Sequence, residues 1–250
     1  MTPRVASPDQ IEAREIEIIQ AAAQLVEKEG VNGLTIDKVV AVVPYSKGTV
    51  YNHFSSKEDL LIALCIYKLN TLSGMFARAK AFNGSTRERL VAFHMAYFLY
   101  ALLSPGQAMA VLYTKTPEIE CKASECRMAR LTSIDGELLS MVVEVMAEAQ
   151  ANQEVHLPPH LNLQQVAFGN WSIAFGTIAL LNSHLDPCPV SQGLLIDREY
   201  FNNVNALLDG YGFQPLSPVF DFQHCIERLL KEVFAEEVAL LAQRGRTLMI

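Results

Sequence analysis

The chain has 250 residues, half of them hydrophobic, which excludes a disordered protein and supplies enough apolar surface for a large core. The formal net charge of −7 excludes binding of nucleic acid through bulk positive charge, so any such contact requires a local patch. We expect the five cysteines to be reduced thiols in a cytoplasmic protein, because their number is odd and no signal peptide is recognisable.

The first predicted helix covers residues 16–29 and ends at Gly30. Ile16, Ile19 and Val26 recur at steps of three and four residues, which is typical of an amphipathic helix, and glycine suits the left-handed position that closes one. The same reasoning predicts further helices at about 35–42, 46–52, 57–81, 86–103, 106–114, 118–151, 163–184 and 219–243. No alternating strand pattern persists, so the predicted fold class is all-α.

Helix start signals support several of these elements. Ser85 with Glu88 and Ser56 with Asp59 have the spacing of a capping box. Ser217 followed by a proline places a cap residue before a residue suited to the first helical turn. The segment 185–217 is the least regular part of the chain, and we expect a short helix near residues 197–208 within it.

Residues 34–61, LTIDKVVAVVPYSKGTVYNHFSSKEDLL, contain two short helices separated by a tight turn. Thr35 and Ser46 are suited to cap the two helices, and an apolar residue stands before each cap and four positions inside it. Together with the preceding and following helices, this arrangement predicts a helix-turn-helix module.

The second short helix carries the residue types that duplex DNA requires. Lysine and imidazolium contact phosphates, hydroxyl and amide groups reach phosphates or base edges, and glycine permits close approach of the backbone. Residues 34–57 contain three lysines and one aspartate, which is a weakly basic patch, whereas residues 12–29 are rich in glutamate. We predict that the module binds DNA through Thr35, Ser46, Lys47, Gly48, Thr49, Tyr51, Asn52, His53 and Lys57.

This stretch, behind IIQAAAQLVEKEGVNG, resembles the DNA-binding domain of TetR-type transcriptional regulators. The resemblance covers about residues 14–65 and is nearly complete over SKGTVYNHF, residues 46–54. It implies a homodimer whose recognition helices enter successive major grooves of a near-palindromic operator, and a larger helical domain that binds a small effector and pairs the subunits. On matching positions it assigns DNA-facing roles to Thr35, Ser46, Lys47, Thr49, Tyr51, His53 and Lys57, and to Phe54 the role of an anchor.

The turn departs from the pattern of that family, which reads alanine-glycine-hydrophobic where this chain has Val43, Pro44 and Tyr45. Proline cannot adopt the positive φ that glycine allows, and it disfavours helical geometry at the residue before it. We therefore expect the first short helix to end early and the recognition helix to be tilted differently. Packing at a helix end is the alternative interpretation of Tyr51 and His53.

The predicted domains are an N-terminal DNA-binding domain, residues 1–56, and a C-terminal helical domain for ligand binding and dimerisation, residues 57–250. The helices at 163–184 and 219–243 carry apolar residues on surfaces that a monomer would expose, so we predict a homodimer through them. Aromatic residues with polar neighbours predict a site for a mainly apolar or aromatic effector, lined by His94, Tyr97, Phe98, Tyr113, Asn170, Trp171 and Phe175. The alternative for each of these residues is ordinary core packing.

The sequence thus predicts a ligand-responsive repressor, in which the effector moves the helix at 57–81 and releases the operator. An activator with the same head, and an all-α enzyme or ligand carrier with an incidental helix pair, are the alternatives. We expect no cofactor and no catalytic site, because neither a phosphate loop nor a nucleophile–base motif is recognisable. We also expect no metal site. No apolar run reaches 18 residues, so we expect no membrane span.

Overall fold

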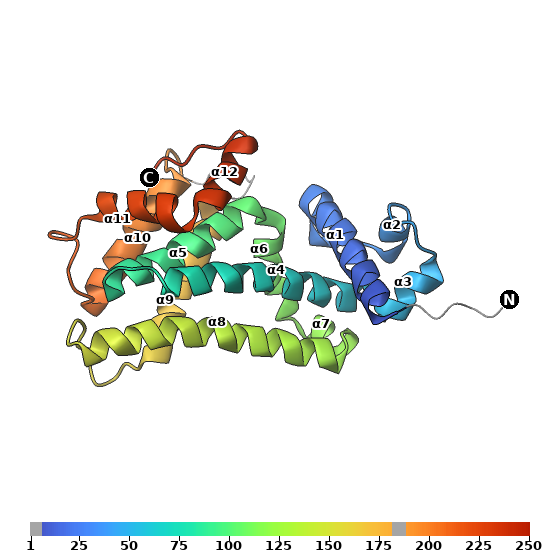
Figure 1. Ribbon diagram of the computed structural model, residues 1–250, viewed down its shortest axis with the longest axis horizontal. Helices are drawn as coiled ribbons and strands as arrows, with labels where there is room; N and C mark the ends of the chain where they lie inside the picture. The colour runs from blue at the N-terminus through green and yellow to red at the C-terminus, as the bar shows by residue number, and fades with distance from the viewer. Residues whose placement is uncertain (1–6, 182–188) are drawn as a thin grey trace. The chain divides into compact units, whose positions relative to one another are not determined.

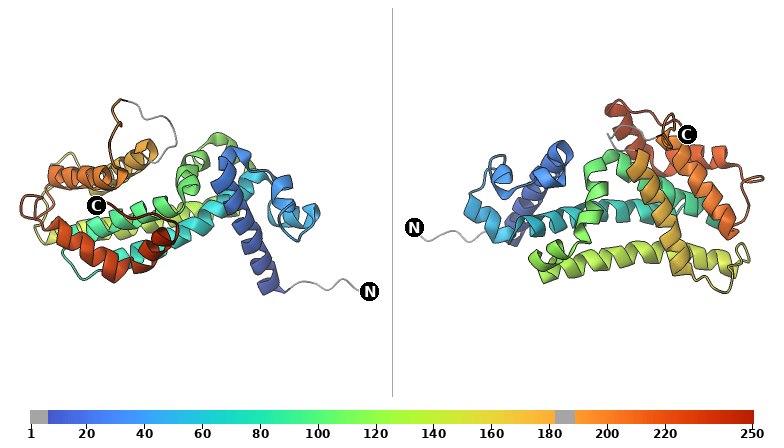
Figure 2. Two further views of the ribbon diagram at one scale, coloured as in Figure 1. Left: turned by 90° about the horizontal axis from the view of Figure 1, so that it is seen from above. Right: turned by 180° about the vertical axis from the view of Figure 1, so that it is seen from behind.

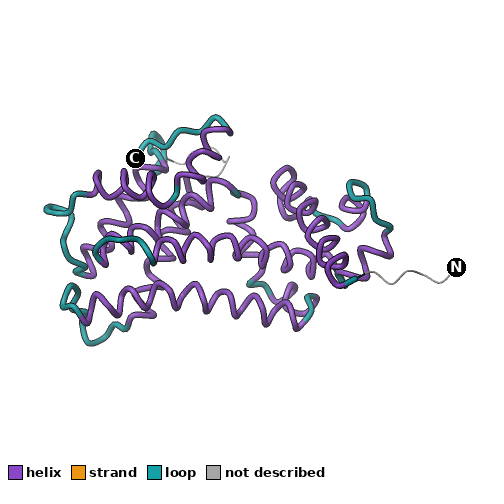
Figure 3. The backbone as a smooth tube through the Cα atoms, in the orientation of Figure 1, coloured by secondary structure: helices purple, strands orange, loops and turns teal. Residues whose placement is uncertain are grey.

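A computed structural model describes residues 7–181 and 189–250. In these residues the backbone forms helices and loops and contains no strand, which confirms the all-α prediction (Figure 3). The last residues of the helix predicted at 163–184 and the first residues of the segment 185–217 lie outside the described residues, in the gap at 182–188.

The chain folds as two compact units. The first unit comprises the residues up to Asn70 together with Ser104–Ile134, and the second comprises Thr71–Leu103 and Asp135–Ile250. Residues 7–56 lie wholly within the first unit, which also takes in the start of the next helix and a later segment. The division at residue 56 therefore stays a functional prediction about where the DNA-binding part ends.

The first unit begins with three helices, drawn in blue in Figure 1. They are α1 (Pro8–Gly33), α2 (Ile36–Val40) and α3 (Lys47–His53). Their apolar residues form one core with the first part of α4, and Ile18, Leu34, Val50 and Phe54 have no exposed surface. Gly30 interrupts α1 with φ of 72°, so the predicted positive φ at this glycine is confirmed.

Four further helices start in this unit or cross its boundary: α4 (Lys57–Lys80), α6 (Pro105–Thr114), α7 (Pro117–Lys122) and α8 (Glu125–Ala151). α6 packs against α1, and the backbone N–H of Gly106 donates to Glu27 of α1 at 3.2 Å. The single helix predicted at 118–151 is wrong, because the chain breaks at Ala123 and Ser124 between α7 and α8.

α4 is the one described helix long and apolar enough to cross a membrane by length and composition. Of its most apolar window, 44% is buried inside the protein, and Leu60, Leu61 and Leu64 belong to the core of the first unit. A buried core helix has the same composition, so the absence of a membrane span stays a prediction.

The second unit contains the remaining helices: α5 (Thr86–Leu103), α9 (Leu163–Leu181), α10 (Ile196–Tyr211), α11 (Phe222–Arg228) and α12 (Ala235–Gln243). α9 packs along α10 and against α5, as the two views of Figure 2 show, and α12 packs on α5. The capping box predicted at Ser85 and Glu88 is present in both directions. The short helix predicted near 197–208 is present as α10 and is longer than expected.

The helix predicted at 219–243 is wrong as a single element. It starts only at Phe222, where Asp221 rather than Ser217 caps it, and a π-helical segment at Leu229–Val233 separates α11 from α12. The backbone leaves helical geometry at Phe234, with φ of −121° and ψ of 24°. Such insertions are invisible to a periodicity argument because the apolar residues keep nearly the same spacing.

A fully buried arginine holds the loop after α10 to α5. Arg87 has no exposed surface, and its Nη1 donates to Asp209 at 2.7 Å and to the carbonyl of Phe213 at 2.7 Å. Its Nη2 donates to Asn205 and Ser217 at 3.2 and 3.1 Å. Removal of one partner of a buried ion pair leaves the other charge uncompensated, so we expect this arginine to stabilise the second unit.

We therefore predict that Arg87→Met lowers the free energy of unfolding by about 3 kcal/mol, because Asp209 loses its buried partner. Urea denaturation followed by circular dichroism measures this change. Arg198→Met is the matched control, since its side chain is 60% exposed and lies 3.4 Å from the Glu199 carboxylate. Its effect is expected below about 1 kcal/mol. Equal losses of unfolding free energy for the two substitutions would contradict the stabilising role of Arg87.

Candidate nucleic-acid interface

The recognition helix α3 begins with a side-chain cap, as predicted. Ser46 Oγ accepts the backbone N–H of Thr49 at 3.2 Å and lies 2.8 Å from the Thr49 hydroxyl. Thr35 caps α2 in the same way, accepting from Lys38 N–H at 3.3 Å. The predicted DNA-contacting hydroxyls therefore also cap the two helices of the motif.

The turn before α3 follows the expectation for Pro44. α2 ends at Val40, two residues before the end predicted from sequence, and residues 41–45 form the turn. Proline restricts the residue before it to extended geometry, which accounts for the early end. Tyr45, the last residue of this turn, is half-buried, donates its hydroxyl to Glu17 of α1 and lies under the guanidinium of Arg14.

Most of the predicted DNA-binding residues are accessible. Exposed side chains or backbone are found at Thr35, Ser46, Lys47, Gly48, Tyr51 and Asn52, and half-buried positions at Thr49, His53 and Lys57. Tyr51 is 46% exposed, whereas the neighbouring Val50 is fully buried. The helix thus presents a lysine, a phenol and an amide to solvent, and all three can contact phosphates or base edges.

Lys47 is the cation at the start of the recognition helix, and its ammonium lies 2.6 Å from the carboxylate of Asp37. The hydrogen bond and charge of Asp37 raise the pKa of Lys47, so this lysine is charged at neutral pH. Both side chains are more than half exposed, and such a surface pair contributes little to stability. A phosphate can therefore compete with Asp37 for the ammonium at low cost.

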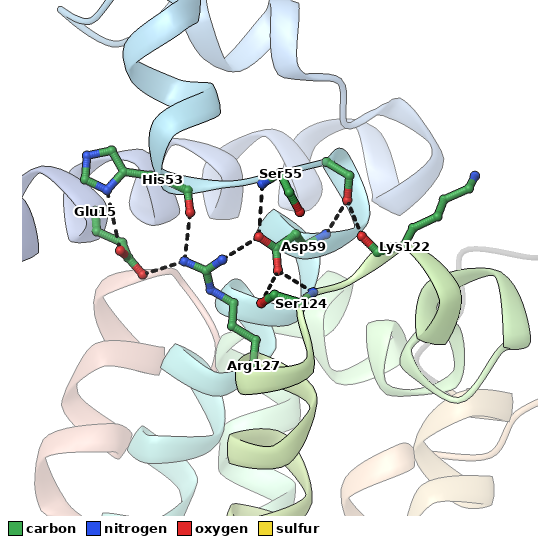
Figure 4. A network of polar contacts seen from close by, with 8 residues as sticks. Glu15, His53, Ser55, Asp59, Lys122, Ser124 and Arg127 are labelled. Atoms are coloured by element: carbon green, nitrogen blue, oxygen red, sulfur yellow. Dashed lines mark hydrogen bonds and ion pairs between the residues drawn. The ribbon is translucent and has the colours of Figure 1, made fainter.

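The expectation that the His53 side chain points outward is wrong. Only 7% of this side chain is exposed, and its Nδ1 lies 3.5 Å from the Glu15 carboxylate of α1 (Figure 4). Its backbone carbonyl accepts a hydrogen bond from Arg127 at 2.9 Å. Glu15 of α1 therefore contacts the C-terminal end of α3.

A buried carboxylate stands immediately behind the recognition helix. Asp59 is 1% exposed and accepts from the backbone N–H of Ser55 at 3.1 Å, from the N–H of Ser124 at 3.0 Å and from the Ser124 hydroxyl at 2.8 Å. Arg127 of α8 donates to the same carboxylate (Figure 4). We name this arrangement of Asp59 and Arg127 with the groups they bind the Asp59–Arg127 clamp.

The pKa of Asp59 reports the balance of forces in the clamp. Burial acts to raise this pKa, but the hydrogen bonds from Ser124 and Ser55 and the charge of Arg127 outweigh it, and the pKa lies below its ordinary value of 3.8. The carboxylate is therefore ionised in the folded protein at neutral pH. The spacing of Ser56 and Asp59 gave a signal for a helix cap, and Ser56 does accept Asp59 N–H at 2.9 Å, but nothing local indicated Arg127.

The residues predicted for effector binding fall into three groups. Tyr113 belongs to the first unit and is 39% exposed, whereas the other six belong to the second unit. Among those six, His94 Nε2 lies 2.9 Å from Asn170 Oδ1, and both residues are buried. Trp171 and Phe175 lie on α9, with ring centroids 5.8 Å apart.

The buried group packs around a tyrosine that sequence reasoning missed. The Tyr200 hydroxyl donates to the His94 carbonyl at 3.0 Å, and its ring stacks on Phe98 with centroids 4.7 Å apart. Burial lowers the pKa of His94 to about 4, although the bond with Asn170 acts to raise it, so this histidine is neutral. Burial also raises the pKa of Tyr97 to about 12. Tyr200 could have been found from the apolar spacing of residues 200, 201, 204 and 208.

Metal ligands are not clustered in the part of the chain that the structure describes: no group of three or more His, Cys, Asp or Glu residues there could hold an ion. The described polar groups are instead ion pairs, such as Asp59 with Arg127, and neutral hydrogen-bonded groups, such as His94 with Asn170. The geometry therefore defines a helix-turn-helix protein whose recognition helix presents Lys47, Tyr51 and Asn52.

Comparisons with known proteins agree with this class. Residues 18–64 match the family described as bacterial regulatory proteins, tetR family. The HTH-type transcriptional repressor KstR2 of Mycobacterium tuberculosis is 26% identical over 160 residues, which cover 63% of this chain and 76% of that protein.

Two solved structures have the same fold. A tetR-family regulatory protein from Rhodococcus RHA1 is 18% identical with a TM-score of 0.62 and covers 80% of this chain and 97% of its own. FadR from Bacillus subtilis, solved in complex with stearoyl-CoA, is 16% identical with a TM-score of 0.61 and covers 78% of this chain and 98% of its own. The match over residues 18–64 identifies the chain as a TetR-family DNA-binding transcriptional regulator, which is a family of non-enzymes.

The clamp yields a prediction about acid stability. Because the folded-state pKa of Asp59 is lowered, the ionised carboxylate stabilises the fold above its unfolded pKa, and this contribution is lost as the pH falls through the folded pKa. Asp59→Asn is expected to lower the free energy of unfolding by about 3 kcal/mol near neutral pH. Urea denaturation at several pH values, from about 6 down to about 3, should show the difference from wild type shrinking towards acid. A difference that stays constant or grows would contradict an ionised Asp59.

Proposed function

We propose that this regulator is a homodimeric repressor that binds a near-palindromic operator and leaves it when a small effector binds. The observation that carries the proposal is the capped recognition helix, which presents Lys47, Tyr51 and Asn52 to solvent over a buried Val50. Repression rather than activation is supported by the name of the relative KstR2, at 26% identity. A regulator of this kind acts where the chromosome lies, so we place it in the cytoplasm.

The proposed DNA-binding surface consists of Thr35, Ser46, Lys47, Gly48, Thr49, Tyr51, Asn52 and Lys57, and His53 is left out because its side chain is buried. Only a few cations contribute, and the chain carries a net charge of −7. Affinity then rests on a small number of phosphate contacts from each of two subunits and falls steeply with salt. Base contacts from the exposed face of α3 supply the sequence preference.

Support for the dimer is strongest on α9. Phe168, Trp171 and Leu180 are 64, 40 and 73% exposed, and the first two rings lie 6.1 Å apart. The adjacent exposed rings of Phe168 and Trp171 mark an interaction surface, and a second copy of the same helix would cover them. This surface is the part of the predicted interface at 163–184 that the structure describes.

The other predicted interface helix receives less support. Within 219–243, Ile226, Leu229 and Phe234 are buried inside their own chain, and Phe222 packs on Phe201 with centroids 5.7 Å apart. Val219 and Leu240, at 78 and 45%, are the large apolar residues of this range that are exposed. Because α10 packs along α9, we propose that α10 rather than α11 borders the interface.

The effector site is proposed among α5, α9 and α10, where His94 and Asn170 place neutral polar atoms in aromatic surroundings. A neutral histidine and an amide can bond a hydroxyl, carbonyl or amide of a mainly apolar molecule, and they offer no charge to a strong anion. The structural neighbour solved with stearoyl-CoA shares the fold at 16% identity, so the effector chemistry rests on the lining residues.

A salt titration tests the DNA-binding surface. Lys47→Met should reduce the slope of log affinity against log salt by about 2, because each of two subunits loses one phosphate contact. Fluorescence anisotropy on a duplex selected by the wild-type protein from a random-sequence library measures the slope. Lys28→Met removes the same charge from an exposed position on α1 and should leave the slope unchanged. Equal slopes for wild type and Lys47→Met would refute the assignment.

A second measurement addresses the dimer. Phe168→Glu introduces a charge into the exposed stripe of α9 and should convert a dimer into a monomer, because buried like charges repel across a two-fold axis. Light scattering behind size-exclusion chromatography should then fall to the chain mass of 27.7 kDa. Val190→Glu, at an 86% exposed position outside α9, is the control and should remain dimeric. Dimerisation of Phe168→Glu as strong as that of the wild type would exclude this surface.

A further inference from the structure

The recognition helix is too short to fix its own position. α3 has seven residues, and an isolated helix of that length is unstable in water. Its N-terminal end is capped by Ser46, and its middle is anchored by the buried Val50. The remaining constraint must act on its C-terminal end, where the last carbonyls have no partner within the helix.

Arg127 supplies that constraint from a distant part of the chain. It is the third residue of α8, and its Nη2 donates to the carbonyl of His53, the last residue of α3, at 2.9 Å. The same nitrogen donates to Glu15 of α1 at 3.0 Å (Figure 4). A cation at this end is also favoured by the helix dipole. One guanidinium therefore joins the ends of α3 and α8 to α1.

The guanidinium itself is held rigidly. Nη1 is bound to the buried Asp59 carboxylate, and Cζ lies 4.7 Å from the centre of the Phe54 ring, which follows α3 directly and is fully buried. Asp59 is fixed in turn by N–H groups on both sides, from Ser55 and from Ser124. Because each partner has several bonds, a shift of the first turn of α8 cannot occur without breaking or moving the contact with α3.

We propose that Arg127, oriented by Asp59, is a positioning residue for operator binding: it sets where the C-terminal end of the recognition helix lies against α8. This inference rests on the proposed operator binding. Arg127 touches no DNA in this account and acts through the His53 carbonyl and the Phe54 ring. Both helices that meet at the Asp59–Arg127 clamp, α4 and α8, continue beyond the first unit.

The test compares specific and non-specific DNA binding by the full-length protein. A duplex of about 30 base pairs, long enough for two half-sites one helical turn apart, is selected by the wild-type protein from a random library, and a scrambled duplex serves as the non-specific probe. Arg127→Met is compared with Arg130→Met, which removes the same charge from an exposed position on the same helix. Dissociation constants come from anisotropy, with the active fraction set by stoichiometric titration.

Arg127→Met should weaken binding to the selected duplex by at least about tenfold, the equivalent of one charge-assisted hydrogen bond, and leave the scrambled duplex unchanged. Arg130→Met should stay within about twofold on both probes. Arg127→Lys keeps the charge but lacks the fork that reaches several acceptors, so it should show a smaller, still selective loss. If Arg127→Met does not fold, the affinities of Arg127→Lys for the two duplexes test the inference instead.

Unchanged affinity of folded Arg127→Met for the selected duplex would overturn the inference, as would an equal loss on both duplexes, which indicates a general folding role. Failure of the wild-type protein to select any duplex would instead refute the proposed function itself. The two failures are therefore distinguishable by the wild-type experiment alone.

Discussion

The ionised carboxylate of Asp59 is the interaction on which the DNA-binding part of the molecule depends. It is buried, yet four donors compensate its charge, and they come from both sides of the junction between the recognition helix and α8. Burial of an unpaired carboxylate costs several kcal/mol, so the groups around it must stay in place. These bonds connect α4, through Arg127, to the carbonyl end of α3.

Each of the two units contains an ion pair with a buried member that joins distant segments of the chain. In the first unit, Asp59 and Arg127 join chain segments 68 residues apart; in the second, Arg87 and Asp209 join segments 122 residues apart. The first pair lies beside the exposed recognition helix, and the second lies under the loop that follows α10. Polar groups that are fully bonded inside a protein favour one arrangement of the chain over its alternatives. Of the two ion pairs, Asp59 with Arg127 is the one next to the proposed DNA-binding surface.

Sequence patterns were sufficient for most helices, because periodicity and caps are local properties. The caps at Thr35 and Ser46, the early end of α2 before Pro44 and the positive φ at Gly30 followed from residue chemistry alone. The clamp could not be predicted, since Arg127 and Asp59 are far apart in sequence and the cap signal at Ser56 and Asp59 says nothing of Arg127. The inward packing of His53 stayed an alternative for the same reason, as its partner Glu15 lies on another helix. The break between α7 and α8 was not predicted, because Ser124 is held by the carboxylate of Asp59, which is distant in sequence.

Amide hydrogen exchange of the wild-type protein, followed residue by residue by NMR, tests the clamp most directly. Ser55 and Ser124 lie outside the helices, but their N–H groups are bound to Asp59, whereas the Phe54 N–H is bound to Val50 at 3.0 Å. If the clamp joins these segments, all three amides exchange slowly and with the same free energy of opening. Rapid exchange of Ser55 and Ser124 beside a protected Phe54 would show that the carboxylate does not hold the recognition helix to α8.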